Sequence, residues 1–314
     1  MIPAVLAADL AKSRISIAVI DRSGRDLLQR SEPCPEYTDQ SAFAERFLDL
    51  AGTLVKSVQK KCKLFSAGIS VCGSPAEPER PISAREVGLS SALHKKLKLP
   101  VAVEQHRNAT VLGEAWKGVA ARKKDVVALI AGAGIEAGIL SAGRLLVGSH
   151  DLAGSAAWMA VSEADGFEVR RFGGLGAFCS EPGIVRAAKN AIDAGFGDLL
   201  AEYDPAKFNA PDIAHLARQG DLTARNIFRR AGHQLGLAAA SLISVFDPEI
   251  LVLTGSMTSA ADLFLDELTQ TALSRCQPLL AQKVQIRLSK LGDKAALLGA
   301  ARLAWEALSE RRSL

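Results

Sequence analysis

Residues 4–20 (AVLAADLAKSRISIAVI) predict two strands joined by a tight polar turn, and this pair decides the fold class. The apolar run at 4–10 carries Asp9 near its end and predicts a buried strand, whereas residues 15–20 alternate in polarity. A third strand is expected after the Ser23-Gly24 turn. Consecutive strands joined by short turns predict an antiparallel meander.

The same layout begins again in the middle of the chain. Residues 126–130 predict a strand, residues 132–138 (GAGIEAG) a Gly/Ala-rich turn, and residues 139–147 the returning strands. Two meanders, each followed by helices and further strands, predict duplicated α/β lobes with a cleft between them. We expect an N-terminal lobe over residues 1–117, a C-terminal lobe over 118–294, and a closing helix within 295–314 that packs on the N-terminal lobe.

Periodicity locates the remaining elements. Helical spacing of apolar residues predicts helices at 41–62, 108–117, 184–194, 211–219, 224–244, 260–275 and 295–308. Short apolar runs predict strands at 65–71, 101–103, 250–253 and 284–288.

Composition limits the class of protein. Hydrophobic residues make up 48% and charged residues 23% of the 314, as in a soluble globular protein with a substantial core. The net charge of +4 is too small to indicate a nucleic-acid-binding face, and the clusters of basic residues are too scattered along the chain. The five cysteines are widely spaced, which argues against a disulfide framework or a cysteine-built zinc site. With no leader pattern and no apolar run near about 18 residues, we expect a cytoplasmic protein with no membrane partner.

Three longer motifs follow one another in order. They are residues 104–114 (EQHRNATVLGE), 246–255 (FDPEILVLTG) and 292–301 (GDKAALLGAA), with Gly220-Asp221 and residues 232–236 (GHQLG) between them. In this order they resemble the ROK family of repressors, open reading frames and sugar kinases. The resemblance implies an actin/hexokinase-like (ribonuclease H-like) α/β fold with two duplicated lobes. It also implies a homodimer.

The resemblance also shows which chemical groups this chain lacks. In a ROK kinase the Asp of E-N-D-A-N activates the sugar hydroxyl, and here His106 stands at that position and Gln105 at the preceding Asn. The sugar-contacting Glu of A-G-E-I-G-H corresponds to Ser155. The four positions of the family's zinc ligands hold residues that cannot ligate zinc, namely Trp158, Phe167, Val169 and Gly174. We therefore expect no zinc and no other metal site.

Two phosphate-binding loops of the family are altered as well. The D-x-G-G-T-K loop corresponds to residues 9–14 (DLAKSR), where both glycines are replaced. The G-T-G-I-G-G-G loop corresponds to residues 132–138, where Glu136 introduces a carboxylate that would repel a phosphate. The resulting candidates for phosphate or nucleotide binding are Asp9, Lys12, Ser13, Gly132, Gly134 and Gly255. The candidates for substrate binding are Gly73, Gln105, His106, Ser155 and Trp158.

Several of these residues have an alternative, structural interpretation. His106 is either a catalytic base or a hydrogen-bonded histidine without catalytic duty, and the second is favoured. Asp9 either holds Mg²⁺ through water or caps its own turn. Trp158 either stacks on a sugar ring or, as we favour, fills the core where the metal loop is lost. Glu104 and Asn108 are expected to fix the turn between them rather than to contact substrate.

Because base, zinc ligands, phosphate loops and sugar carboxylates are all changed, the sequence predicts a non-catalytic relative. It is expected to bind a small ligand, a sugar derivative, in the interlobe cleft and to have a regulatory role. The alternatives are an active ATP- and Mg²⁺-dependent sugar kinase that uses His106, and a structural dimer. Family repressors carry a winged-helix segment before the ROK body, whereas here the first strand begins by Ala4. We therefore expect no direct contact with nucleic acid.

Overall fold

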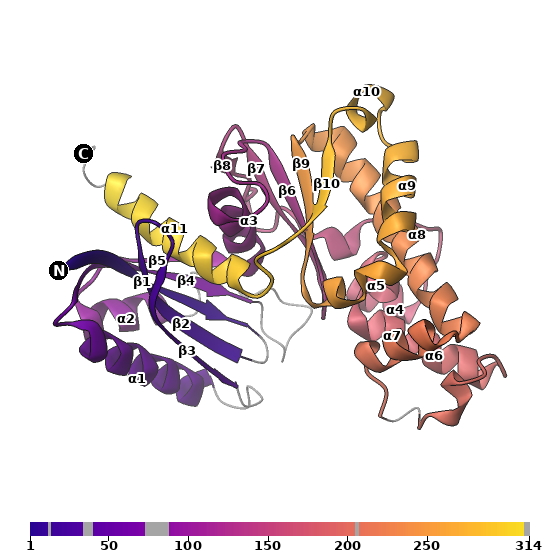
Figure 1. Ribbon diagram of the computed structural model, residues 1–314, viewed down its shortest axis with the longest axis horizontal. Helices are drawn as coiled ribbons and strands as arrows, with labels where there is room; N and C mark the ends of the chain where they lie inside the picture. The colour runs from indigo at the N-terminus through magenta and orange to yellow at the C-terminus, as the bar shows by residue number, and fades with distance from the viewer. Residues whose placement is uncertain (12–13, 34–39, 73–87, 205–206, 311–314) are drawn as a thin grey trace. The chain divides into compact units, whose positions relative to one another are not determined.

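The computed structural model describes residues 1–11, 14–33, 40–72, 88–204 and 207–310, which form two compact units (Figure 1). The first unit comprises Met1–Arg122 and Asp293–Leu314, and the second comprises Lys123–Gly292. The N-terminal part of the first unit thus extends to Arg122, whereas the sequence predicted that it ends at residue 117. The turn after that helix explains the difference, because the Arg122 N–H still donates to the Ala115 carbonyl at 3.4 Å.

The sheet of the first unit has the strand order β3-β2-β1-β4-β5. Its strands are β1 (Ile2–Leu10), β2 (Arg14–Asp21), β3 (Asp26–Pro33), β4 (Cys62–Val71) and β5 (Val101–Gln105). The meander β1-β2-β3 is antiparallel, whereas β4 and β5 run parallel to β1. The carboxyl ends of β1, β4 and β5 therefore lie at one edge of the sheet.

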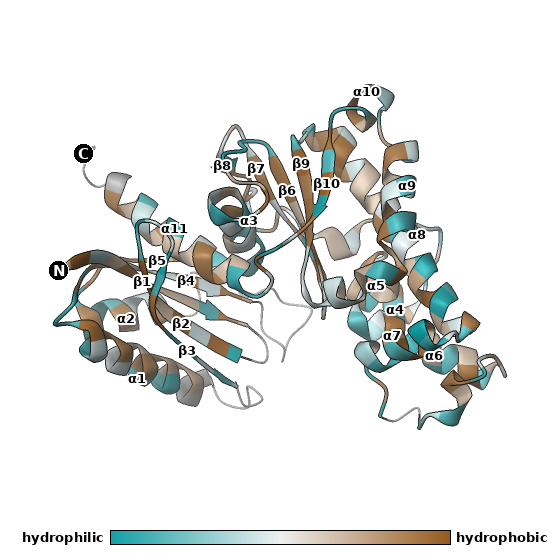
Figure 2. Cartoon of the chain, viewed as in Figure 1, coloured by the Kyte–Doolittle hydropathy of each residue, from teal (hydrophilic) through white to brown (hydrophobic). Residues whose placement is uncertain are grey.

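The sheet of the second unit repeats this order as β8-β7-β6-β9-β10. Its strands are β6 (Val126–Ala131), β7 (Ile135–Ser141), β8 (Arg144–Leu145), β9 (Ile250–Thr254) and β10 (Gln285–Leu288). Again the first three strands are antiparallel and the last two are parallel to the first. The central strands β6 and β9 are mostly hydrophobic and the edge strand β10 is more hydrophilic (Figure 2). The duplication predicted from the two meanders is confirmed.

One predicted turn is wrong. The turn expected over residues 132–138 covers only three residues, because β7 already begins at Ile135. Glu136 is a strand residue that pairs with Ile130. Ala137 and Gly138 have low strand propensity, which conceals this strand in the sequence. The strand forms nevertheless because Ile135 and Ala137 are buried in the core of the second unit.

Helices cover both faces of the first sheet. They are α1 (Gln40–Val58), α2 (Leu89–Leu97), α3 (His106–Lys117) and α11 (Lys294–Glu310). Alternate residues of β1, among them Leu6 and Ala8, pack with α1 and α2. Helix α11 packs on β1, β4 and α3 (Figure 1). The helix predicted over 41–62 ends at Val58, since Cys62 already opens β4.

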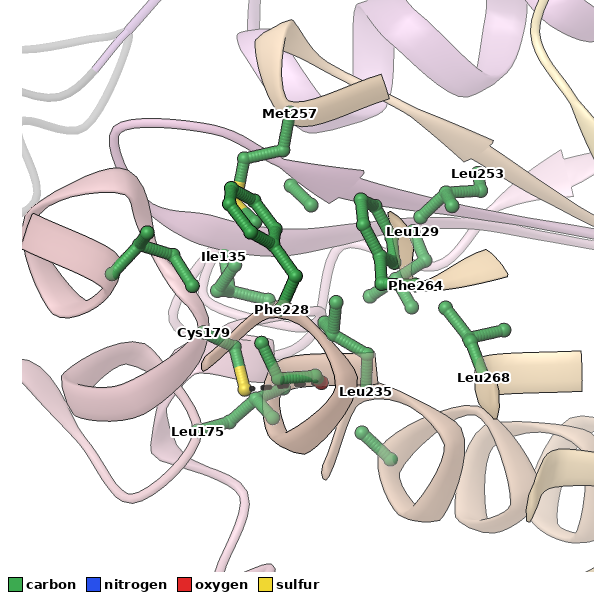
Figure 3. Close-up of a cluster of buried hydrophobic side chains, with 14 of the residues drawn as sticks. Leu129, Ile135, Leu175, Cys179, Phe228, Leu235, Leu253, Met257, Phe264 and Leu268 are labelled. Atoms are coloured by element: carbon green, nitrogen blue, oxygen red, sulfur yellow. Dashed lines mark hydrogen bonds between the residues drawn. The ribbon is translucent and has the colours of Figure 1, made fainter. Parts of the chain in front are cut away.

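The second unit places its helices around a separate core. They are η1 (Ala156–Trp158), α4 (Phe167–Phe172), α5 (Gly176–Cys179), α6 (Glu181–Asp193), η2 (Leu200–Glu202), α7 (Ala210–Gln219), α8 (Leu222–Phe246), η3 (Ser256–Leu263), α9 (Leu265–Arg275) and α10 (Pro278–Ala281). Phe228 of α8 and Phe264 before α9 pack with Leu129 and Leu253 of the sheet (Figure 3). The helix predicted over 260–275 is divided at Phe264. Across the described ranges, no helix is both long and apolar enough to span a membrane.

Candidate functional site

The carboxyl ends of three parallel strands bring polar side chains together in the first unit. Asp9 of β1 pairs in register with Ser70 of β4, and Ser70 pairs with Glu104 of β5. His106 comes directly after β5 and is the first residue of α3. These residues come from three segments far apart in the sequence, and the parallel register of the strands sets their separation.

Asp9 is the centre of this cluster. The Ser70 hydroxyl donates a hydrogen bond to Asp9 Oδ1 at 2.7 Å. His106 Nδ1 lies 3.2 Å from the same carboxylate oxygen and 3.5 Å from Ser70 Oγ. The Asp9 side chain is 3% exposed and the His106 side chain 22% exposed. One edge of the imidazole is therefore fixed by Asp9, while part of the ring reaches the surface of the unit.

The electrostatics of this cluster favour a charged imidazole. Burial of the ring opposes the positive charge, but the neighbouring Cys72 sulfur and the Asp9 carboxylate outweigh it and raise the pKa of His106 well above 6.5. The raised pKa favours the imidazolium form of the ring, which donates hydrogen bonds from both nitrogens and has no lone pair to accept a proton. Such a group binds acceptors and anions, and it cannot act as a general base.

The turn between β5 and α3 is held by its own side chains. Glu104 Oε1 accepts hydrogen bonds from the Gln105 N–H and from Asn108 Nδ2, each at 2.9 Å. This confirms the prediction that Glu104 and Asn108 fix the turn. Gln105 is only 4% exposed, so little of its surface is available to a substrate in this conformation.

Two of the candidate glycines meet at the edge of the second sheet. Gly132 follows β6 and Gly255 follows β9, its parallel neighbour. A Cβ on Gly132 would lie 2.6 Å from Ser256 Oγ, and one on Gly255 would lie 2.3 Å from the Ala131 carbonyl oxygen. Gly255 also has a φ of 98°, which L side chains rarely adopt. Backbone packing and the positive φ thus require glycine at position 255, whereas at position 132 a Cβ would crowd the Ser256 hydroxyl.

Gly134 and Glu136 have different surroundings. The described part of the chain places no atom within 4 Å of a Cβ on Gly134, so this turn position is open. Glu136 alternates along β7 with Ile135 and Ala137, whose side chains enter the core (Figure 3 labels Ile135). The Glu136 side chain therefore points to the opposite face of the sheet.

The two segments that correspond to the family's zinc site do lie together. The Leu175 N–H donates to the Ala157 carbonyl at 2.9 Å, and a Cβ on Gly173 would lie 2.2 Å from that carbonyl oxygen. Backbone fills this space, and the Trp158 side chain is 57% exposed. The prediction that Trp158 fills the core is therefore wrong. Ser155 Oγ donates to the Leu152 carbonyl at 2.7 Å, so its hydroxyl is used within its own turn.

Three of the predicted site residues lie outside the described ranges, and Ser70, which contacts His106, was not predicted. Lys12, Ser13 and Gly73 lie outside the described residues. Within the described ranges, no cluster of three His, Cys, Asp or Glu side chains suits a metal ion. Sequence reasoning missed Ser70, although its place at the carboxyl end of a strand expected beside residues 4–10 could have indicated it.

The sequence was also compared with known protein families. Residues 5–307 of this chain match the sequence model of the ROK family. The chain belongs to the ROK family. A xylose repressor from Caldicellulosiruptor bescii is 24% identical over 94% of this chain and 76% of its own length. A glucokinase from Thermotoga maritima is 31% identical over 68% of this chain and 69% of its own length.

Solved structures of ROK proteins share the fold. A ROK transcriptional regulator homologous to the E. coli MLC protein has a TM-score of 0.83 at 23% identity, covering 98% of this chain and 78% of its own. A ROK hexokinase from Thermus thermophilus has a TM-score of 0.79 at 21% identity, covering 98% and 99%. The chain therefore has the hexokinase-like α/β fold. Because repressors and kinases both match, the expectation of no nucleic-acid contact stays a prediction, as does the homodimer.

Proposed function

We propose that this ROK protein is non-catalytic and binds a small sugar derivative beside Asp9 and His106, in a regulatory role. The observation that carries the proposal is the bond between these two residues. By resemblance to ROK kinases, His106 stands at the position of their catalytic Asp. Its raised pKa favours the protonated ring, which is a hydrogen-bond donor beside Asp9. Exchanging a proton acceptor for a cation removes general-base catalysis while keeping hydrogen-bonding capacity toward sugar oxygens.

The nucleotide side supports the same proposal. The first phosphate loop of the family needs glycines for close backbone approach, and this chain has Ala11 and Lys12 at those positions. In the second unit, Gly132 and Gly255 are explained by contacts with Ser256 and Ala131 alone. These two glycines are therefore no argument for ATP binding, whereas Gly134, whose surroundings are open, stays a candidate.

Ligand-dependent stabilisation tests the proposal. We expect at least one member of a panel of hexoses, amino sugars and sugar phosphates to raise the unfolding temperature, whereas ATP with Mg²⁺ should not. A ligand at one hundred times its Kd adds about 2.7 kcal/mol to stability, which a thermal-shift titration detects easily. The matched variant His106→Gln should lose most of the sugar-dependent shift. ATP-dependent phosphorylation of any sugar by the wild type, abolished in His106→Ala, would overturn the proposal.

An active kinase is the second candidate, with ATP and Mg²⁺ as its cofactors. The Asp9–His106 bond favours it, because a carboxylate on one imidazole nitrogen orients the other nitrogen toward a substrate. Since the ring is protonated at neutral pH, such a kinase would become active only as the pH rises through the raised pKa. A phosphorylation assay repeated at increasing pH distinguishes this candidate from a purely binding protein.

Metal content tests a separate part of the proposal. We expect purified protein to contain no zinc, because Trp158, Phe167, Val169 and Gly174 occupy the ligand positions and backbone contacts join the two segments. Elemental analysis by mass spectrometry measures this directly. One zinc per chain would show that the correspondence of residues 167–174 with the family's cysteine motif is wrong.

A further inference from the structure

A thiol lies beside the His106 ring, and the proposed function makes no use of it. Cys72 follows β4, and its N–H donates to the Leu10 carbonyl at 3.1 Å, continuing the β1–β4 pairing past Val71. Its side chain is partly exposed. The backbone bond fixes the position of the thiol, and the exposure gives small reagents access to it.

The strand geometry directs this thiol toward the imidazole. Ser70 and Cys72 are two residues apart on an extended segment, so their side chains point to the same face. Ser70 Oγ lies 3.5 Å from His106 Nδ1, and the Cys72 sulfur interacts with the same ring. Asp9 holds the ring through Nδ1 at 3.2 Å. Cys72, His106 and Asp9 therefore lie together, with Asp9 at Nδ1 of the ring and the Cys72 sulfur interacting with the same ring.

The start of α3 strengthens this arrangement. His106 is the first residue of this twelve-residue helix, whose N-terminal end carries partial positive charge. A thiolate near a helix N-terminus and an imidazolium is stabilised by both. The first turn of α3 therefore places partial positive charge beside the His106 ring, with which the Cys72 sulfur interacts.

We propose that Cys72 is a reactive thiol, activated by His106, whose reaction partners are hydroperoxides and small alkylating electrophiles. In the reaction with hydrogen peroxide, the thiolate attacks one peroxide oxygen, forming the S–O bond and breaking the O–O bond. The sulfur is oxidised to sulfenic acid and the peroxide is reduced. The departing hydroxide takes the proton of the His106 imidazolium and leaves as water, so one peroxide and one thiol give one sulfenic acid and one water.

The other described cysteines provide internal controls. Cys62, Cys179 and Cys276 are 6%, 0% and 6% exposed. Burial raises the pKa of the Cys179 and Cys276 thiols. The Cys179 sulfur lies inside the core of the second unit and donates to the Ala231 carbonyl at 3.6 Å (Figure 3). All three thiols are buried, so they should react slowly with the same reagents.

Timed alkylation of the full chain with iodoacetamide at neutral pH, followed by peptide mass spectrometry, tests the proposal. We expect Cys72 to be labelled at least about tenfold faster than Cys62, Cys179 and Cys276, as an activated thiol should be. Each cysteine is read on its own peptide, so Cys34, which lies outside the described residues, does not affect the result. Treatment with hydrogen peroxide and dimedone, a sulfenic-acid trap, should label the Cys72 peptide.

Variants then identify the activating group. His106→Gln should slow labelling of Cys72 on the order of tenfold, and Asp9→Asn should also slow it, because each removes charge that holds the pair. His233→Gln is the matched control, since His233 is an exposed histidine of the second unit bonded to Thr271. Circular dichroism confirms that each variant is folded. Labelling of Cys72 no faster than that of the buried thiols, or unchanged in folded His106→Gln, would overturn the proposal. No sugar or nucleotide enters the assay, so its result is independent of the proposed function.

Discussion

Gly299→Ala is expected to destabilise the first unit by about 3 kcal/mol or more, at the upper end of what overpacking costs. A Cβ at this position would lie 1.7 Å from the Ala109 carbonyl oxygen and 2.4 Å from its carbon. Those atoms belong to the backbone of α3 and cannot rotate away as a side chain would. Helices α3 and α11 are also in close contact at Gly113, where a Cβ would lie 1.9 Å from the Ala295 carbonyl oxygen. The two helices would have to separate along their whole contact.

Urea unfolding followed by tryptophan fluorescence measures this effect. In a Trp158→Phe background the remaining tryptophans, Trp116 and Trp305, both belong to the first unit, so the signal follows that unit alone. Gly52→Ala in α1 is the matched control within the first unit, because the nearest neighbour of its Cβ would be the flexible end of the Lys96 side chain, at 3.0 Å. A loss below about 0.5 kcal/mol in Gly299→Ala, the range of ordinary surface changes, would show that α3 and α11 are not so closely packed.

The fold was predictable because its determinants are local. Strands such as β1 and β6 are short apolar runs bounded by turn residues, and the repeated meander sets the topology of both sheets. Gly299 belongs to the motif at residues 292–301, and the close contact with Ala109 explains why a glycine stands there. Where the local signal is weak, prediction failed: the small residues of β7 were taken for a turn, and α2 was not predicted at all.

The candidate site was less predictable because it depends on contacts between distant segments. His106 was found from its motif, but its bond to Asp9 joins residues 97 apart in the sequence. The bond between Ser70 and Asp9 depends on the parallel register of β1 and β4, which no local pattern specifies. Trp158 was expected to fill the core where the family's metal loop is lost. Backbone contacts between Ala157 and Leu175 close that space and leave the indole outside.

Stability of the first unit is expected to fall as the pH rises above about 6.5, the usual His pKa, because Cys72 and Asp9 raise the pKa of His106 in the folded state. The folded state raises the pKa of His106, so between 6.5 and the raised value it binds more protons than the unfolded chain. In that window stability decreases with pH. The stabilisation by His106 is therefore fully present below 6.5 and is lost as the pH passes through the raised pKa.

A double-mutant cycle measured at several pH values isolates this pair, using wild type, Asp9→Asn, His106→Gln and the double variant. Asp9→Asn keeps an oxygen that can accept from Ser70 but removes the charge, so at pH 6 we expect a loss of about 2 kcal/mol, less than for a fully buried pair because His106 is 22% exposed. The coupling free energy should shrink toward zero at alkaline pH. If the coupling is the same at pH 6 and pH 10, His106 does not change its charge in this range, and the argument that it is a cation rather than a base at neutral pH fails.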